Sequence, residues 1–167
     1  LAIFVTQQIE GGTVEMVAFA TATYWLTKSS IQPFLANVLD VIKGEKDDFK
    51  VLIFGMYLAS LIPIGYFFAT SVWHIFFLEF FRGCAMACVV PAWYGIFTRH
   101  ISKGWEAFSW SVSSTGVGFA AGFSAAFGGI IAYFLGFKIL FIMVALLKAT
   151  SATIYLFTYK QAFKEKI

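Results

Sequence analysis

Two oppositely charged residues interrupt an apolar run near the middle of the sequence. Residues 76–88 read FFLEFFRGCAMAC, and the charged positions are Glu79 and Arg82. On a helix, residues three positions apart share one face, so these two side chains can pair. An unpaired charge at bilayer depth costs about 2.5 to 3.5 kcal/mol, which favours a position facing protein or water. The pair either fixes helix register or reaches the outer headgroups, or it lines a path for substrate or protons.

Further polar residues fall inside apolar segments. Lys28, with Gln32 one turn further, and Lys148 are expected near the middle of their helices, too deep for their ammonium groups to reach the surface easily. We expect both lysines to face a cavity with a positive midplane, which suits an anionic or polar substrate, or a counter-carboxylate from a partner half. Helix ends shifted by one turn would instead bring Lys28 nearer to water. The candidates for a substrate or proton path are Lys28, Gln32, Glu79, Arg82, Lys148 and Glu15, the last near the outer end of its segment.

Other chemistries have weaker support. Cys84 and Cys88 lie four positions apart, but without a nearby His or further Cys they are expected to be packing residues rather than metal ligands. Hydroxyl side chains cluster at residues 109–115, yet no His or carboxylate lies at matching depth to activate one as a nucleophile. We therefore expect no metal, no cofactor and no enzyme activity, and we name no catalytic residue.

The composition requires a membrane environment for these residues. Apolar residues make up 60% of the 167-residue chain and charged residues only 13%, whereas a soluble domain has about 25% charged residues. Residues 51–70 contain no charge over 20 positions, which matches a hydrocarbon core of roughly 30 Å. The expected partners are the lipid bilayer and a small solute, and no nucleic acid.

Apolar runs separated by charged or glycine-containing turns predict a bundle of transmembrane helices. Continuous runs of this length favour helices over alternating barrel strands, and a helix satisfies its own backbone hydrogen bonds in lipid. The predicted fold class is an all-α, polytopic transmembrane helix bundle over residues 13–160. Its helices are expected at about 13–39, 49–70, 75–99, 104–134 and 138–159, after the end of a preceding helix or loop at 1–12 and before a cytoplasmic tail at 161–167.

Basic residues are unevenly distributed between the two ends of these helices. The opposite turns hold only Lys138, and the positive-inside rule places the richer side in the cytoplasm, with the chain in the inner or cell membrane. The 40–50 loop, the 99–104 loop and the C-terminal tail together hold Lys43, Lys46, Lys50, Arg99, Lys103, Lys160, Lys164 and Lys166.

Small residues recur every four positions in the fourth apolar segment. Ser114, Gly118, Gly122 and Ala126 form one strip, and Gly129 ends a second strip beside it. Such strips let two helices approach closely, because lipid gives no hydrophobic drive for association. We expect this helix to pack tightly, either within an ordinary bundle or against a specific partner.

The order of these features resembles one six-helix half of a major facilitator superfamily transporter. An Asp ends one helix before a charged loop, followed by an uncharged helix, a helix with Arg-Gly and Pro-Ala, another cytoplasmic loop, and a glycine-rich helix. Matched in this way, residues 13–159 are similar to helices two to six and residues 1–9 to the end of helix one. The resemblance implies a half-transporter that needs a second half-unit.

The match is uneven at single positions. Asp40 takes the place of the family's Asp between helices two and three, with Ala36 for its Gly and Val38 for its Leu. The resemblance implies that Asp40 meets Arg99 at the end of helix four. The implied cytoplasmic gate consists of Asp40, Arg99, Lys43 and Lys46.

Helices four and five also match in part. Aligned on Gly83, Glu79 holds the position of the family's helix-four Arg, and Arg82 holds the adjacent Gln position. No Pro follows Gly122, so the antiporter form of the helix-five motif is incomplete. The residues that match its glycine pattern, and are expected to serve helix packing, are Gly118, Gly122, Gly128 and Gly129.

The leading hypothesis is a secondary active transporter, or half of one. It would move a small polar or anionic solute by alternating access, with or without ion coupling, as one bundle rocks against another. The second half would be another copy in a two-fold homodimer or the missing part of a longer chain. The alternative is a non-transporting scaffold subunit of a larger complex that retains the half-transporter fold.

Overall fold

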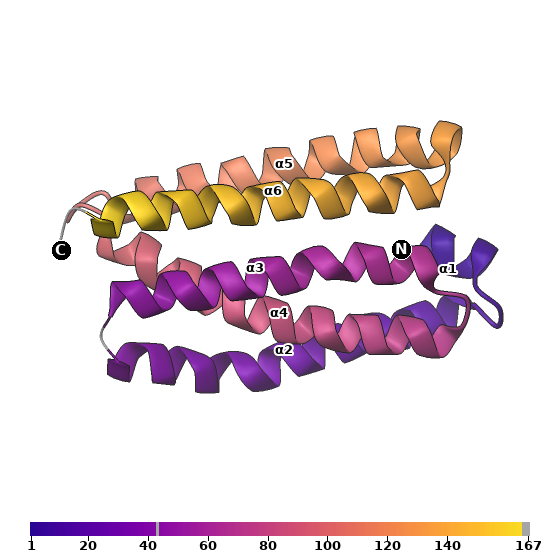
Figure 1. Cartoon of the computed structure of the whole chain (residues 1–167), viewed down its shortest axis with the longest axis horizontal. Coiled ribbons are helices and arrows are strands. Elements are labelled where there is room, and N and C mark those ends of the chain that lie inside the picture. The colour runs from indigo at the N-terminus through magenta and orange to yellow at the C-terminus, as the bar shows by residue number, and fades with distance from the viewer. Residues whose placement is uncertain (43, 165–167) are drawn as a thin grey trace.

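The computed structural model describes residues 1–42 and 44–164, and every regular element in this part of the chain is a helix (Figure 1). The helices are α1 (Ala2–Gln8), α2 (Val14–Ile42), α3 (Glu45–Phe68), α4 (Val72–Arg99), α5 (Glu106–Leu135) and α6 (Phe137–Lys164). The expected all-α class is therefore confirmed for the described residues.

Helix length and composition identify an integral membrane protein. Among the described residues, four helices are long and apolar enough to cross a membrane, namely α3, α4, α5 and the part of α6 from Phe137 to Gln161. Such a span needs about 20 predominantly apolar residues. α2 has 29 residues but is not one of these four, because polar side chains interrupt it. The fifth crossing stays a prediction.

Several helix ends differ from those that the sequence pattern predicts. The pattern predicts a loop through residue 48, whereas α3 begins at Glu45. Its first turn carries Glu45, Asp47 and Asp48, and carboxylates are favourable there because the first N–H groups of a helix are positively polarised. At the other end of the chain, α6 continues to Lys164, past the predicted end at 159.

The tightly packed part of the bundle consists of α2, α3, α4 and α6. α3 packs against both α4 and α6, and α2 packs against α4. Glycines allow two of these contacts: a Cβ on Gly55 of α3 would lie 2.8 Å from the Cys88 side chain, and one on Gly83 of α4 would lie 2.9 Å from Thr27 of α2. Buried apolar residues fill the α1 end of the bundle (Phe4, Val5, Ile9, Ala20, Ile62, Tyr66 and Ile75) and its opposite end (Leu39, Leu52 and Ala92).

α5 is packed much more loosely than the other long helices. None of its residues is buried, and in Figure 1 it runs beside α6, away from α2. A Cβ added at Gly118, Gly122 or Gly129 would meet nothing within 4 Å, and one at Gly128 would meet only Leu140, at 3.8 Å. The expected tight packing of these glycines is therefore not made among the described residues.

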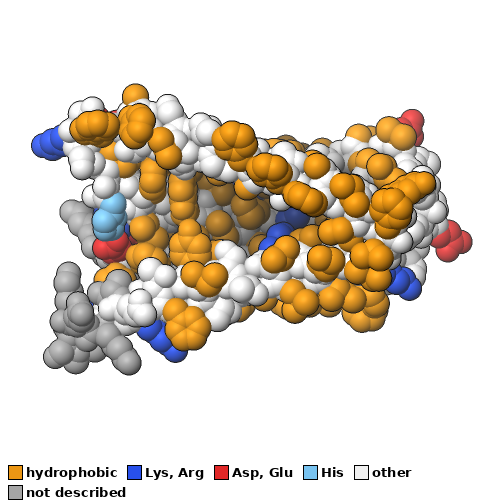
Figure 2. Space-filling view, turned by 90° about the horizontal axis from the view of Figure 1, so that it is seen from above, with side chains coloured by type: hydrophobic (Ala, Val, Ile, Leu, Met, Phe, Trp, Pro, Cys, Tyr) orange, Lys and Arg blue, Asp and Glu red, His pale blue; other side chains and the backbone are white. Residues whose placement is uncertain are grey.

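The loose attachment of α5 leaves space beside it. From the α5–α6 side, the surface is hollowed near its middle, and Lys or Arg side chains lie within the hollow (Figure 2). One cavity of about 720 Å³ lies between α1, α5 and the start of α6, and its α5 wall is made of Ser124, Ala125, Gly128, Gly129, Ala132 and Tyr133. The small residues of α5 thus border open space rather than a neighbouring helix of this chain.

Candidate functional site

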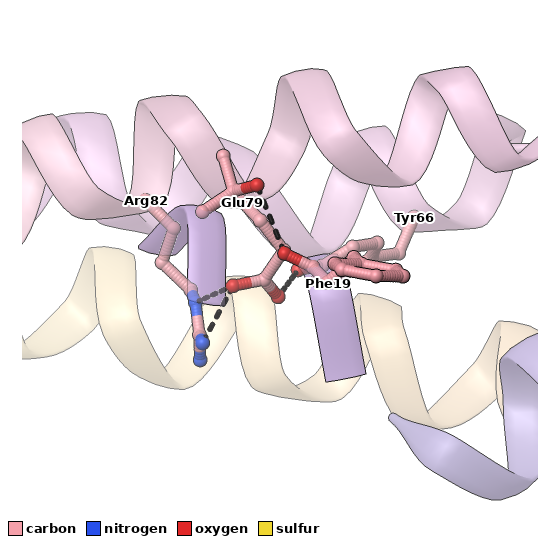
Figure 3. Close-up of polar contacts among 5 residues, drawn as sticks. Phe19, Tyr66, Glu79 and Arg82 are labelled. Atoms are coloured by element: carbon pink, nitrogen blue, oxygen red, sulfur yellow. Dashed lines mark hydrogen bonds and ion pairs between the residues drawn. The ribbon is translucent and has the colours of Figure 1, made fainter. Parts of the chain in front are cut away.

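A buried carboxylate is the centre of the polar contacts between the helices. Glu79 of α4 has no exposed surface, and its Oε1 accepts a hydrogen bond of 2.5 Å from the hydroxyl of Tyr66 of α3. Its Oε2 lies 2.9 Å from Nε and 2.6 Å from Nη2 of Arg82 (Figure 3). Both carboxylate oxygens have partners, and this compensation is what makes a buried charge tolerable.

An aromatic ring covers the other side of Arg82. The guanidinium carbon lies 3.9 Å from the centre of the Tyr24 ring of α2, close enough for a cation–π interaction. Tyr24 is itself buried, next to the close approach of α2 to Gly83. The Glu79 cluster, defined as Tyr24, Tyr66, Glu79 and Arg82, therefore connects three helices.

Lys148 of α6 brings a second cation to this cluster. It lines a cavity of about 180 Å³, the Lys148 cavity, together with Tyr66, Glu79 and Arg82. Its Nζ lies 3.5 Å from the carbonyl oxygen of Ala59, and no carboxylate in the described part of the chain lies within ion-pair distance of it. Counted over side chains, one carboxylate and two cations leave a formal excess of one positive charge. The remaining wall is formed by Leu1, Ile62, Pro63, Leu140, Phe141 and Val144.

The other residues predicted for the path lie elsewhere. Lys28 is half-buried on α2, with its Nζ 4.9 Å from the centre of the Trp25 ring. Glu15 is exposed, and within residues 1–42 and 44–164 no ion pair or hydrogen bond joins it to Arg82. Neither residue lines the Lys148 cavity, and Gln32 lines a different one. Three of the predicted residues therefore converge and three do not.

A second polar cavity lies at the Arg99 end of the bundle. Its volume is about 400 Å³, and its polar wall comes from Gln32, Asp40, Asp48, Tyr94, Thr98 and Arg99. Arg99 pairs here with Asp48 of α3, whose side chain is almost fully buried. The contact joins Nη2 of Arg99 to Oδ2 of Asp48 as an ion pair, and Oδ2 accepts no aligned hydrogen bond from the described residues.

This pairing corrects the expectation for the cytoplasmic gate. Asp40 was the partner implied for Arg99, but it is exposed on α2 and lines the cavity without forming the ion pair. The reason is the early start of α3, which carries Asp48 into the contact between α3 and the end of α4. Lys46 is not at this cavity: its Nζ lies 5.5 Å from the ring centre of Phe163. Lys43, the remaining gate candidate, lies outside the described residues.

Sequence reasoning missed three residues of these sites. Tyr66 lies in an uncharged apolar run and Tyr24 in a run of mixed residues, and a tyrosine at either position gives no pattern that distinguishes a polar contact from apolar packing. Asp48 belongs to the stretch GEKDD, which has the composition of a surface loop. A search for acidic residues in the first turn of α3 would have found it.

The charged side chains at these two cavities form ion pairs. They contain no group of three or more His, Cys, Asp or Glu side chains that could hold a metal ion. α4 contributes Arg82 to one cavity and Arg99 to the other, and these residues are separated by roughly 25 Å at 1.5 Å per residue. Such an arrangement provides one polar site deep in the apolar bundle and a second at its end.

Comparison with known families agrees with this architecture. A family model described as Major Facilitator Superfamily matches residues 2–166. The chain belongs to the major facilitator superfamily. Comparisons with curated proteins and with solved structures found no match. Members of the superfamily are membrane transporters rather than enzymes, so membership indicates a transport protein.

The charged residues on α4 of this superfamily member differ from the helix-four pattern that the resemblance implies. In the match on Gly83 that the resemblance implies, a carboxylate, Glu79, takes the position of the family's helix-four Arg. The guanidinium is supplied by Arg82 about one turn further along the same helix, and it points at Glu79 (Figure 3). The site thus contains an Arg, but one that is already engaged by a carboxylate of its own helix.

Proposed function

We propose that the chain is one half of a secondary active transporter that moves a small polar or anionic solute by alternating access. The Lys148 cavity is its solute site. The observation that carries this proposal is the convergence of Lys148 with Glu79 and Arg82 from two helices on one cavity inside an apolar bundle. Charged groups are expensive at this depth, and transporters of this kind bind solute near the midplane.

The requirement for a second half-unit is supported by α5. Its glycine strip faces open space, and helices in lipid associate through such close-packing strips. The second unit in this proposal is a second copy or the remainder of a longer chain. Gly122→Leu would then leave the single unit folded but abolish its association, as judged by light scattering of the detergent-solubilised protein, whereas Lys103→Ala in the exposed connecting turn would not.

The proposal also includes an orientation and a gate. The basic 40–50 and 99–104 segments and the C-terminal tail lie in the cytoplasm of a cell or inner membrane. The Asp48–Arg99 pair, with Asp40 in the same cavity, then lies at the cytoplasmic end. Opening of this end toward the cytoplasm would separate the pair or shift it with α3.

The test is solute flux in liposomes that contain the purified protein. The panel consists of radiolabelled propionate, phosphate, glycine and glucose, with protein-free liposomes as the baseline. We expect flux of at least one polar solute, reduced at least tenfold by Glu79→Gln or Lys148→Gln. Lys138→Gln is the matched control, because this lysine lies over the Phe67 ring in the first turn of α6 and does not line the cavity.

A second candidate function is a scaffold subunit without transport. The observation that favours it is the lack of any buried residue on α5, whose phenylalanines at 119, 123 and 127 stack along one exposed face. A fixed protein partner covering this face, combined with baseline flux across the whole panel, would replace the transport proposal with this one.

A further inference from the structure

The polar groups of the Lys148 cavity differ in how fully they are satisfied. Glu79 accepts a hydrogen bond from Tyr66 at Oε1 and one from Arg82 at Oε2. Arg82 is held between that carboxylate and the Tyr24 ring. The charge of Arg82 is neutralised by Glu79, so this pair carries no net charge with which to attract an anion.

Lys148 has no comparable partner. Its contact with the Ala59 carbonyl oxygen is 3.5 Å long, beyond the usual 2.7–3.2 Å of a strong N–H···O hydrogen bond. An ammonium group has three donors, and the described residues give this one no counter-charge. A half-buried cation inside an apolar bundle is unfavourable alone and becomes more favourable when a carboxylate pairs with it.

The rest of the cavity limits what can supply that carboxylate. Its volume of about 180 Å³ equals roughly six water molecules at about 30 Å³ each. Ile62, Phe141 and Val144 contribute apolar surface to its wall, and an apolar wall with few polar groups is the usual form of a small-ligand site. A solute that fits has one negative group and a short aliphatic part.

We propose that Lys148 is the specificity-determining residue of this cavity and that its ligand is a small aliphatic monocarboxylate. The carboxylate pairs with Nζ of Lys148, and the aliphatic part lies against the apolar wall, while the Glu79 cluster remains intact. Binding neutralises the excess positive charge, so monoanions are preferred over neutral amides, cations and dianions. This inference rests on the proposed function for its solute site and narrows the solute class.

The experiment compares propionate with propionamide, its uncharged isostere, on the purified full chain in detergent. The first readout is the shift of the thermal unfolding midpoint with ligand concentration, because a ligand stabilises the folded form in proportion to its occupancy. We expect saturable stabilisation by propionate and none by propionamide or choline at equal ionic strength. Lys148→Gln should weaken the apparent affinity at least about 30-fold, the loss expected for truncating one partner of a buried charge pair. Lys148→Arg should restore part of it, and Lys138→Gln should leave it unchanged.

A second variant tests the assigned role of Glu79. Glu79→Gln releases Arg82 and raises the formal excess charge to two, so malonate, a dianion, should then stabilise the protein more than propionate does. In the parent chain, propionate should stabilise the protein more than malonate does.

The inference is overturned if propionamide binds as well as propionate, if Lys148→Gln binds propionate normally, or if no carboxylate binds because a partner unit already pairs with Lys148. Flux of glycine or glucose that is insensitive to Lys148→Gln would overturn it while leaving the transport proposal standing. Carboxylate binding without flux would support it and remove transport.

Discussion

Tyr66 of α3 donates a hydrogen bond of 2.5 Å to Glu79 of α4, inside a bundle where both side chains are buried. The contact joins two helices that also pack against each other along their length. It lies opposite the Arg82 contact on the same carboxylate, so Glu79 is fixed in one orientation. This fixed carboxylate determines which charges in the Lys148 cavity are free.

Removing the Tyr66 hydroxyl should destabilise the bundle. Tyr66→Phe leaves Oε1 of Glu79 without its partner, and a hydrogen bond to a charged group contributes about 1.5 to 3 kcal/mol. The measurement is the free energy of unfolding in detergent, followed by tryptophan fluorescence. Tyr57→Phe is the control, because its hydroxyl bonds to Thr153 in a half-buried, uncharged contact and should cost about 1 kcal/mol. Equal losses of unfolding free energy in the two variants would show that the Tyr66 hydroxyl contributes no more than an uncharged hydrogen bond.

Arg82→Gln should be more damaging than Glu79→Gln or the double variant. It leaves Glu79 buried and charged, and removal of one partner from a buried pair costs about 3 to 5 kcal/mol. The double variant replaces the pair by two neutral amides and should recover much of that loss. A double-mutant cycle on the free energy of unfolding measures the coupling. A coupling energy near zero would show that the pair is not an energetic unit.

The two aspartates at the Arg99 cavity should respond differently to neutralisation. Asp48→Asn removes the buried partner of Arg99, so we expect a fall of about 2 kcal/mol or more in the free energy of unfolding. Asp40→Asn should change it by less than about 0.5 kcal/mol, because exposed charges contribute little. The reverse order in the same unfolding assay would restore Asp40 as the partner of Arg99.

Gly83→Ala should weaken the contact between α2 and α4. The added Cβ would lie 2.9 Å from both Thr27 Cβ and the Tyr24 carbonyl oxygen, and overpacking of this kind costs about 1 to 3 kcal/mol. Gly116→Ala on α5 meets nothing within 4 Å, and it should stabilise its helix because Ala is a better helix former than Gly. Circular dichroism during thermal unfolding distinguishes the two. A stabilising Gly83→Ala would show that the helices can separate without cost.

The sequence predicted the fold class because apolar length is a direct consequence of the lipid environment. It also predicted that Glu79 and Arg82 would pair, since their spacing is local to one helix. It placed Lys148 in the same candidate path but did not show which side chains Lys148 would meet, because those neighbours depend on how α6 packs against α3. Tyr24 and Tyr66 were not predicted as partners for the same reason, because each lies on a different helix from Glu79.

The errors arose where local composition and tertiary packing point in different directions. Asp48 has the neighbours of a loop residue but lies in the first turn of α3, buried against Arg99. The glycines of α5 have the spacing of a packed helix, but a Cβ at Gly118, Gly122 or Gly129 would meet no described atom within 4 Å. Lys28 lies on α2 beside Trp25 rather than in the Lys148 cavity, because rotation of a helix about its axis is set by neighbours that a single sequence does not reveal.

Two contacts anchor α5 near its ends. At one end Trp110 packs edge-on against Phe97, with ring centres 4.9 Å apart, and at the other the left-handed Gly136 (φ 83°) turns the chain directly into α6. Between these anchors the helix runs beside α6 and buries none of its residues. Its middle amide protons should therefore exchange with deuterium sooner than those of α3, and acyl chains can enter and leave the space beneath it.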